Sequence, residues 1–146
     1  MALTLIGTGV SFDLTLAGLD ALKSADEAYM ETYTNPIERE KILALERACG
    51  KKITLLQRER MESPYLAERA KAAKVCILAS GDPLTATTHI SLVMEARENG
   101  VAVEIIHNSS IYCAAPGRAG LQIYRFGRTA RGRQPSWQRE AAPLLP

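Results

Sequence analysis

The feature that most constrains the fold is a regular alternation of strand-like and helix-like segments, repeating about every 25 residues. Five short segments rich in apolar residues are expected to be strands, at 2–7, 27–33, 52–57, 75–80 and 101–107. Near-continuous apolar strands separated by helices are typical of a parallel sheet with both faces covered. The pattern therefore predicts an α/β fold: a three-layer sandwich with a mainly parallel five-stranded sheet and right-handed crossovers.

Capping residues, prolines and glycines place the helices between these strands. Three helices are expected at 35–50, 63–73 and 85–98. Two more are expected to begin at Asp13 and, as a short helix, at Ser109 or Ser110. Pro116 falls inside the last of them and removes a backbone hydrogen bond, so that helix is expected to be short or kinked. Segment 121–127 is expected to be one more extended piece.

Length and composition narrow the class of protein. The chain has 146 residues, 47% of them hydrophobic and 23% charged, which is typical of one soluble globular domain. The longest apolar run, Val75 to Ala79, is far shorter than the roughly 20 residues of a membrane span, and the start lacks the positive charges of a secretory signal. We therefore expect a cytoplasmic protein without a membrane anchor. The three cysteines are isolated, so neither a disulfide framework nor a metal site is expected.

Charge is distributed unevenly along the chain. Residues 1–117 carry 12 Lys and Arg against 15 Asp and Glu, whereas residues 118–146 carry 6 against 1. A basic end can bind phosphates, but this one has a single Trp137 and no repeating basic and aromatic register. A solvated tail is the favoured interpretation, and no direct nucleic-acid binding is expected.

Small and hydroxyl residues gather where the predicted strands end. In parallel sheets, ligands bind beyond the carboxyl ends of the strands, near a switch in strand order. Four segments follow those ends here, at 7–10, 33–35, 80–89 and 107–111. The sequence therefore predicts a ligand site at this edge of the sheet.

Asp82 is the strongest single candidate in these segments. Gly81 lets the backbone leave the strand in a conformation that a Cβ disfavours, and Pro83 restricts Asp82 to an extended geometry. The alternative role for Asp82 is a helix cap or an Asx turn. One capping residue does not explain the three threonines that follow, whose hydroxyls and backbone N–H groups suit a polar or anionic ligand: Thr85, Thr87 and Thr88.

The two histidines are expected to be structural rather than catalytic. His89 has no Cys or acidic partner at metal-ligand spacing, which favours a structural hydrogen bond. His107 with Ser109 or Ser110 resembles a base and nucleophile, but neighbours on one strand end rarely face each other. With no G-x-S-x-G elbow either, no catalytic residue is predicted.

A dinucleotide-binding domain is a minor alternative. Gly7 and Gly9 supply the first two glycines of a dinucleotide fingerprint, but Phe12 stands where the third should be. Glu27 and Glu31 lie roughly where a ribose-binding acid is found in such domains. The simpler explanation of the two glycines is a tight strand-to-loop turn.

Several motifs, taken in order, resemble the diphthine synthase family of the tetrapyrrole-methylase superfamily. They are "LIGTGVSFDLTLAGLDAL", "YMETYT", "GDPLTATTH" and "HNSSIYCAA", followed by "GLQIYRFGRT". The resemblance covers about residues 1–129. The central motif joined to the later "GLQIYRFG" is more selective than a glycine motif alone.

This resemblance implies a methyltransferase that uses S-adenosyl-L-methionine and releases S-adenosyl-L-homocysteine. It implies action on the modified histidine of translation elongation factor 2 during diphthamide biosynthesis, by a cytoplasmic homodimer. Carried over residue by residue, it implies cofactor contacts at five positions: Val10, Asp82, Thr85, Ser110 and Ile111. Methyl transfer from a sulfonium to an amine is one displacement that needs alignment more than an acid or base, which agrees with the absence of a triad or metal cluster.

The resemblance also implies a second α/β domain that completes the cofactor pocket. Residues 1–129 are expected to form the tetrapyrrole-methylase-like N-terminal domain, and 130–146 an irregular basic, Pro-containing tail that looks more like a truncated or frameshifted end than a domain. A pocket with one wall missing predicts weak cofactor binding and little methyl transfer by the chain alone. The remaining alternative is a non-catalytic α/β module that associates through the surface where a second domain packs.

Overall fold

The structure, a computed structural model, describes residues 1–33, 35 and 37–127. Its centre is a five-stranded sheet in the order β3-β2-β4-β1-β5, and every pairing is parallel. The strands are β1 (Ala2–Gly7), β2 (Glu27–Glu31), β3 (Ile53–Leu56), β4 (Lys74–Ala79) and β5 (Ala102–Ile106). The predicted α/β fold with a parallel five-stranded sheet is confirmed.

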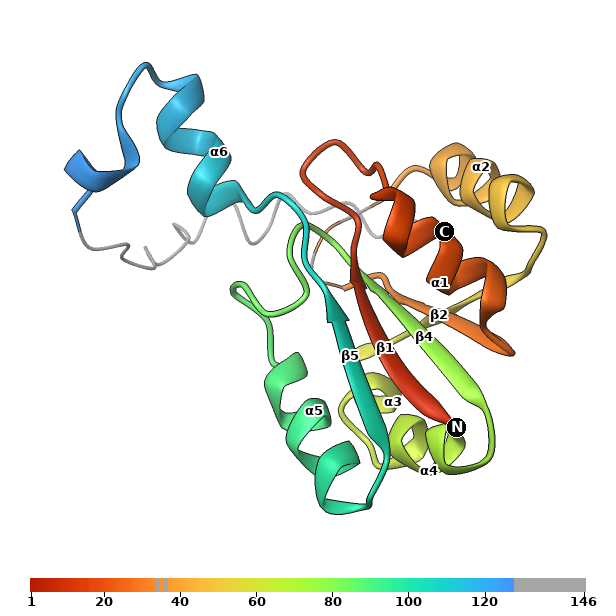
Figure 1. The fold of residues 1–146 in the computed structure, drawn as a ribbon. Helices are drawn as coiled ribbons and strands as arrows, with labels where there is room; N and C mark the ends of the chain where they lie inside the picture. Colours follow the sequence, from red (N-terminus) through yellow and green to blue (C-terminus); the bar gives the residue numbers. More distant parts are fainter. Residues whose placement is uncertain (34, 36, 128–146) are drawn as a thin grey trace, which may run out of the picture.

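Helices cover both faces of the sheet and give the predicted three layers (Figure 1). The helices are α1 (Leu16–Ser24), α2 (Arg39–Cys49), α3 (Arg58–Met61), α4 (Tyr65–Ala72), α5 (His89–Glu98) and α6 (Ile111–Arg118), followed by the 3₁₀ turn η1 (Ile123–Arg125). One apolar cluster joins the sheet to α1 and α2, and a second joins it to α4 and α5.

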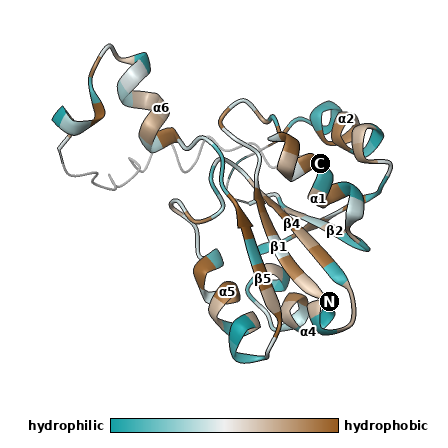
Figure 2. Cartoon of the chain, in the orientation of Figure 1, coloured by the Kyte–Doolittle hydropathy of each residue, from teal (hydrophilic) through white to brown (hydrophobic). Residues whose placement is uncertain are grey.

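The alternation of side chains along β1 explains why the sheet is buried on both faces. Leu3 and Leu5 pack into the cluster under α4 and α5, whereas Ile6 packs into the cluster under α1. Each of these three residues is fully buried, and burying such a side chain contributes about 1.5–3 kcal/mol. Figure 2 shows the hydrophobic character concentrated on the central strands. The core thus fixes β1 beside β4, with their carboxyl ends at the same edge.

Three predicted helix starts are wrong. Thr15, not Asp13, caps α1 and accepts a hydrogen bond from the backbone of Gly18 at 3.0 Å. α2 begins at Arg39 rather than after Asn35. α5 begins at His89 rather than Thr85, because Ala86 has a left-handed backbone (φ 58°) that interrupts a helix.

α6 and η1 stand away from the α/β body (Figure 1). α6 is eight residues long and contains Pro116, so the expected short helix is confirmed. Segment 121–127 is not an extended strand but contains the turn η1, which packs against α6. The predicted tail at 130–146 lies outside the described residues.

None of the helices in the described ranges has the length and apolarity that crossing a bilayer requires.

Candidate functional site

The loops that follow β1, β4 and β5 meet at the carboxyl edge of the sheet. A two-residue bridge joins the first two loops: the backbone N–H of Gly9 donates to Gly81 O at 3.0 Å, and that of Gly81 donates to Gly9 O at 3.3 Å. Both glycines have left-handed backbones, with φ of 66° and 72°. A side chain at either position would strain the bridge, so the predicted glycine turn has a definite structural cause.

Gly7 ends β1 at the most crowded point of the site. A Cβ there would lie 2.6 Å from Gly81 O, 2.9 Å from the Cβ of Asn108 and 3.0 Å from Cδ of Pro83. Because the neighbours come from the loop after β4 and the loop after β5, the missing side chain lets these two loops meet above the end of β1.

Asp82 connects the same two loops through its carboxylate. Oδ1 accepts hydrogen bonds from the backbone N–H of Leu84 at 3.0 Å and from the hydroxyl of Thr85 at 3.1 Å. Oδ2 lies 2.7 Å from Nδ1 of His107 and accepts from the backbone N–H of Asn108 at 3.4 Å. The alternative role predicted for Asp82, an Asx turn, is therefore present in the structure beside its position at the predicted site.

These contacts keep Asp82 ionised although it is only 8% exposed. Burial alone raises the pKa of this carboxyl, but the hydrogen bonds from Leu84, His107 and Thr85 outweigh burial and lower the pKa below its usual value. Facing an ionised carboxylate, Nδ1 of His107 carries the proton and donates it to Oδ2.

A cavity of about 370 Å³ opens beside Asp82 at this edge. Its size falls within the range of small-molecule pockets. All five predicted cofactor residues line it, and Val10 and Ile111 supply partly exposed apolar walls. The ten lining residues are Val10, Asn35, Ser80, Gly81, Asp82, Thr85, Ala86, Thr87, Ser110 and Ile111. The structure thus brings the predicted residues together, and their binding of a cofactor stays a prediction.

Ser110 precedes α6 as predicted, but its side chain does not cap the helix. Its hydroxyl is instead directed to Sγ of Cys113 at 3.8 Å, and no capping hydrogen bond from its side chain is present. Thr87 and Thr88 also have partners within the protein, since their hydroxyls donate to Pro83 O and to a carboxylate oxygen of Glu62. Of the three predicted threonines, Thr85 and Thr87 line the cavity.

Asn108, which was not among the residues predicted from the sequence, ties the loop after β1 to the loop after β5. Its side-chain amide donates to Gly7 O at 3.0 Å and to Asp13 O at 2.8 Å, and its carbonyl accepts from the backbone of Ser109. The hydroxyl of Ser109 in turn accepts from the backbone N–H of Val10 at 3.1 Å. The position of "HNSS" directly after a strand indicated that Asn108 lies at the ligand edge predicted for the sheet. Its hydrogen-bond partners depend on the fold and could not be inferred from the sequence.

Replacing Asn108 with aspartate is expected to destabilise the protein more than replacing it with alanine. Alanine removes two hydrogen bonds and should cost about 1–2 kcal/mol. Aspartate places a carboxylate oxygen against the two carbonyls of Gly7 and Asp13, so its cost should be larger, about 2–3 kcal/mol. Urea unfolding of both variants measures the order. Equal stabilities of the two variants would contradict the role assigned to the amide.

His89 and Glu31 form a buried polar pair at the start of α5. Nδ1 of His89 lies 3.1 Å from Pro83 O, and Nε2 lies 3.6 Å from a carboxylate oxygen of Glu31. Both residues are at most 2% exposed. This geometry agrees with the predicted structural role of His89.

The dinucleotide alternative finds no support in the two acidic residues that suggested it. Glu31 lies in the protein interior beside His89. Glu27 accepts hydrogen bonds from Arg69 and Tyr29, and the bond from Arg69 is the largest influence that lowers its pKa. Both carboxylates are engaged within the protein rather than directed to the glycine turn.

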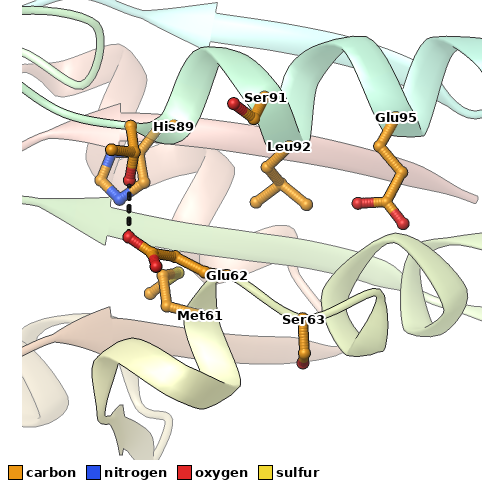
Figure 3. A pocket seen from close by; sticks show the side chains of 8 residues that line it. Met61, Glu62, Ser63, His89, Ser91, Leu92 and Glu95 are labelled. Carbon is orange, nitrogen blue, oxygen red and sulfur yellow. Dashed lines mark hydrogen bonds between the residues drawn. The ribbon is translucent and has the colours of Figure 1, made fainter.

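A second cavity, of about 320 Å³, lies between α5 and the α3–α4 segment (Figure 3). Glu62 and Glu95 face it from opposite sides, and Thr88 donates a hydrogen bond to Glu62 at 3.2 Å. None of the five predicted cofactor residues lines this cavity. Within the described ranges, no three His, Cys, Asp or Glu side chains gather in the way a metal ion needs.

Comparisons with known proteins agree with the family resemblance of the sequence motifs. Residues 2–144 match the family model of the Tetrapyrrole (Corrin/Porphyrin) Methylases. The chain is 42% identical over 129 residues to a diphthine synthase of Methanothermobacter thermautotrophicus, which covers 86% of this chain and 49% of that protein. It is 40% identical over 146 residues to a diphthine synthase of Archaeoglobus fulgidus, covering 97% and 57%.

Solved structures of this group share the fold. A crystal structure of diphthine synthase superposes with a TM-score of 0.80 at 41% identity, covering 87% of this chain and 52% of that one. A putative diphthine synthase from Entamoeba histolytica gives 0.72 at 36% identity, covering 87% and 48%. The chain spans about half the length of the curated relatives that it matches.

Proposed function

Because this chain belongs to the tetrapyrrole (corrin/porphyrin) methylase family and is a homologue of diphthine synthases, we propose that it forms the donor-binding part of an S-adenosyl-L-methionine-dependent methyltransferase of diphthamide biosynthesis. The protein substrate proposed is translation elongation factor 2, methylated at its modified histidine. A cytoplasmic homodimer is the proposed working form. Residues 1–129 are the proposed domain, with 130–146 as a tail.

The observation that carries this proposal is the convergence of five residues on one cavity. Val10 comes from the loop after β1, Asp82 and Thr85 from the loop after β4, and Ser110 with Ile111 from the start of α6. These segments are far apart in the sequence, and the family resemblance implies a cofactor contact at each of the five positions. A ligand that combines an apolar ring with a charged tail needs such a mixture of apolar wall and polar groups.

The chemistry asks these residues to bind and align rather than to react. When bound, the cofactor supplies a methyl group on a sulfonium. Val10 and Ile111 offer apolar surface to a nucleoside, while the hydroxyl of Thr85 and the backbone N–H groups at the start of α6 can hold polar groups. Holding the donor in one orientation lowers the entropic part of the barrier to transfer.

A non-catalytic interaction module is the second candidate, and a specific observation favours it. Several large apolar side chains are exposed on α6 and on segment 121–126, which contains η1: Ile111, Tyr112, Leu121, Ile123, Tyr124 and Phe126. An apolar surface of this kind is typical of a protein–protein contact. Sedimentation at rising concentration tests this association, because a protein that stays monomeric throughout contradicts both self-association through α6 and η1 and the proposed homodimer.

Titration with S-adenosylhomocysteine, followed by NMR, tests the methyltransferase proposal. We expect the amide signals of Val10, Thr85 and Ile111 to shift together, because these residues line one cavity. NMR detects binding even at millimolar dissociation constants, so a site with few contacts is still visible. Adenosine and methionine, added separately, should each shift part of the same set.

Signals from the second cavity provide the internal control. Glu62 and Ser91 line the cavity between α5 and α3–α4, so their amide signals should not shift. Shifts confined to that cavity, or no shift at any signal up to millimolar ligand, would contradict the proposed donor site.

A further inference from the structure

His107 lies beside the proposed donor site without lining its cavity. It follows β5, and its side chain is 65% exposed, whereas the side chain of Asp82 is 10% exposed. The contact between them, 2.7 Å from Nδ1 to Oδ2, joins an exposed imidazole to a buried carboxylate. Because His107 contacts the cavity only through Asp82, any effect of His107 on the site must act through Asp82.

Asp82 receives donors from two different loops. Leu84 and Thr85 belong to the loop after β4, and they bind Oδ1. His107 and Asn108 belong to the loop after β5, and they bind Oδ2. His107 gives the shorter of the two contacts on the second side, 2.7 Å against 3.4 Å, and its contact is the one made by a side chain.

We propose that His107 is a positioning residue, which through its Nδ1–H holds the Asp82 carboxylate and thereby fixes the loop after β4 against the loop after β5. The consequence for ligand binding rests on the proposed function, since these loops carry Thr85 on one side of the cavity and Ser110 with Ile111 on the other. The effect on the loops themselves does not rest on it.

The geometry assigns this role to Nδ1 and not to Nε2. Nδ1 is the ring nitrogen that contacts Asp82, and His107 is not one of the residues that line the cavity. A hydrogen bond to a charged group contributes more than one between neutral groups, so its loss should be measurable although the histidine is exposed. Loss of this bond leaves Oδ2 with the longer contact from Asn108.

Three substitutions separate the two nitrogens. In His107→Asn the side-chain amide can take the place of Nδ1–H, whereas in His107→Gln it reaches the place of Nε2, and His107→Ala removes both. With S-adenosylhomocysteine as the probe, we expect His107→Ala and His107→Gln to bind about tenfold more weakly than the unmodified chain, the loss of one charged hydrogen bond. His107→Asn should stay within about threefold of it.

Hydrogen exchange provides a readout that needs no ligand. The amides of Leu84 and Asn108 donate to the Asp82 carboxylate, so both should exchange faster in His107→Ala and His107→Gln than in His107→Asn. The amide of Val93 in the centre of α5 reports on global opening, so its exchange should accelerate less than that of Leu84 and Asn108. A purely global loss of stability would instead accelerate all three amides by the same factor.

The outcomes distinguish this inference from the proposed function. If the unmodified chain does not bind the probe but exchange follows the expected order, the donor site fails and the positioning role stands. If His107→Gln keeps both the affinity and the protection while His107→Asn loses them, the imidazole acts through Nε2 and the inference is wrong. Equal exchange at Leu84 and Asn108 in all four proteins also overturns it.

Discussion

A methyl group added at position 7 is expected to lower the free energy of unfolding by about 3 kcal/mol, the upper end of the cost of overpacking. The new Cβ of Gly7→Ala would lie 2.6 Å from a backbone oxygen, Gly81 O, and 3.0 Å from the ring of Pro83. Neither neighbour is the free end of a flexible side chain, so the strain cannot be relieved by a rotamer change. The loops after β4 and β5 must separate instead.

Urea unfolding measures this cost, with Gly117→Ala as the matched control. A Cβ at Gly117 meets nothing within 4 Å, and this glycine lies inside α6. Alanine there should leave stability unchanged or raise it by up to about 1 kcal/mol, because alanine favours the helix. If Gly7→Ala costs no more than Gly117→Ala, the loops after β4 and β5 do not depend on the missing side chain at position 7.

The strands, and the edge of the sheet at which the candidate site lies, were predictable because each follows from local patterns. Apolar runs of four to six residues separated by helical segments leave few topologies besides a parallel sheet. A parallel sheet puts the carboxyl end of every strand at one edge. The segments "GDP" and "HNSS" each follow a strand, so both had to lie at that edge.

The partners within the site were not predictable, because they depend on strand order. β1 lies between β4 and β5 in the sheet, so Asp82 and His107 follow strands that are not adjacent. They reach each other because β1 ends in Gly7, which has no side chain to separate the two loops. A local reading of Gly7 indicates a turn, and the additional role appears only once three strands are placed.

The late start of α5 has a similar cause. Thr85 carries a good start signal, but its hydroxyl binds the Asp82 carboxylate. Ala86 then adopts a left-handed backbone, and the hydroxyl of Thr87 donates to Pro83 O. The residues that look like the first turn of a helix therefore form the loop that lines the cavity, since these local side-chain hydrogen bonds compete with the helix and outweigh a helix propensity of a few tenths of a kcal/mol.

Replacing Asp82 with asparagine is expected to destabilise the protein by about 2–3 kcal/mol at neutral pH. The carboxylate accepts from four donors, two on each oxygen. An asparagine retains one acceptor oxygen and turns an NH₂ group toward the other pair of donors, so that pair loses its acceptor. Each pair includes a backbone N–H, of Leu84 or of Asn108, and the loss of two hydrogen bonds to a charged acceptor accounts for a cost of this size.

The cost of Asp82→Asn should depend on pH in one direction. The pKa of Asp82 is lowered in the folded protein, so the folded state favours the ionised form more than the unfolded state does. The stability that this carboxylate contributes is therefore complete above its ordinary pKa of about 4, and is lost as the pH falls through the lower folded-state pKa. The difference in unfolding free energy between the two proteins should shrink over that acidic range.

Urea unfolding at neutral and at acidic pH tests both the size and the sign, with Asp20→Asn as the control. Asp20 is an exposed residue of α1, and its substitution should change stability by less than about 0.5 kcal/mol at neutral pH. A difference between the unmodified chain and Asp82→Asn that stays constant or grows on acidification would mean that the carboxylate is not held by the donors seen around it. In that case neither the joined loops nor the cavity between them would depend on the charge of Asp82.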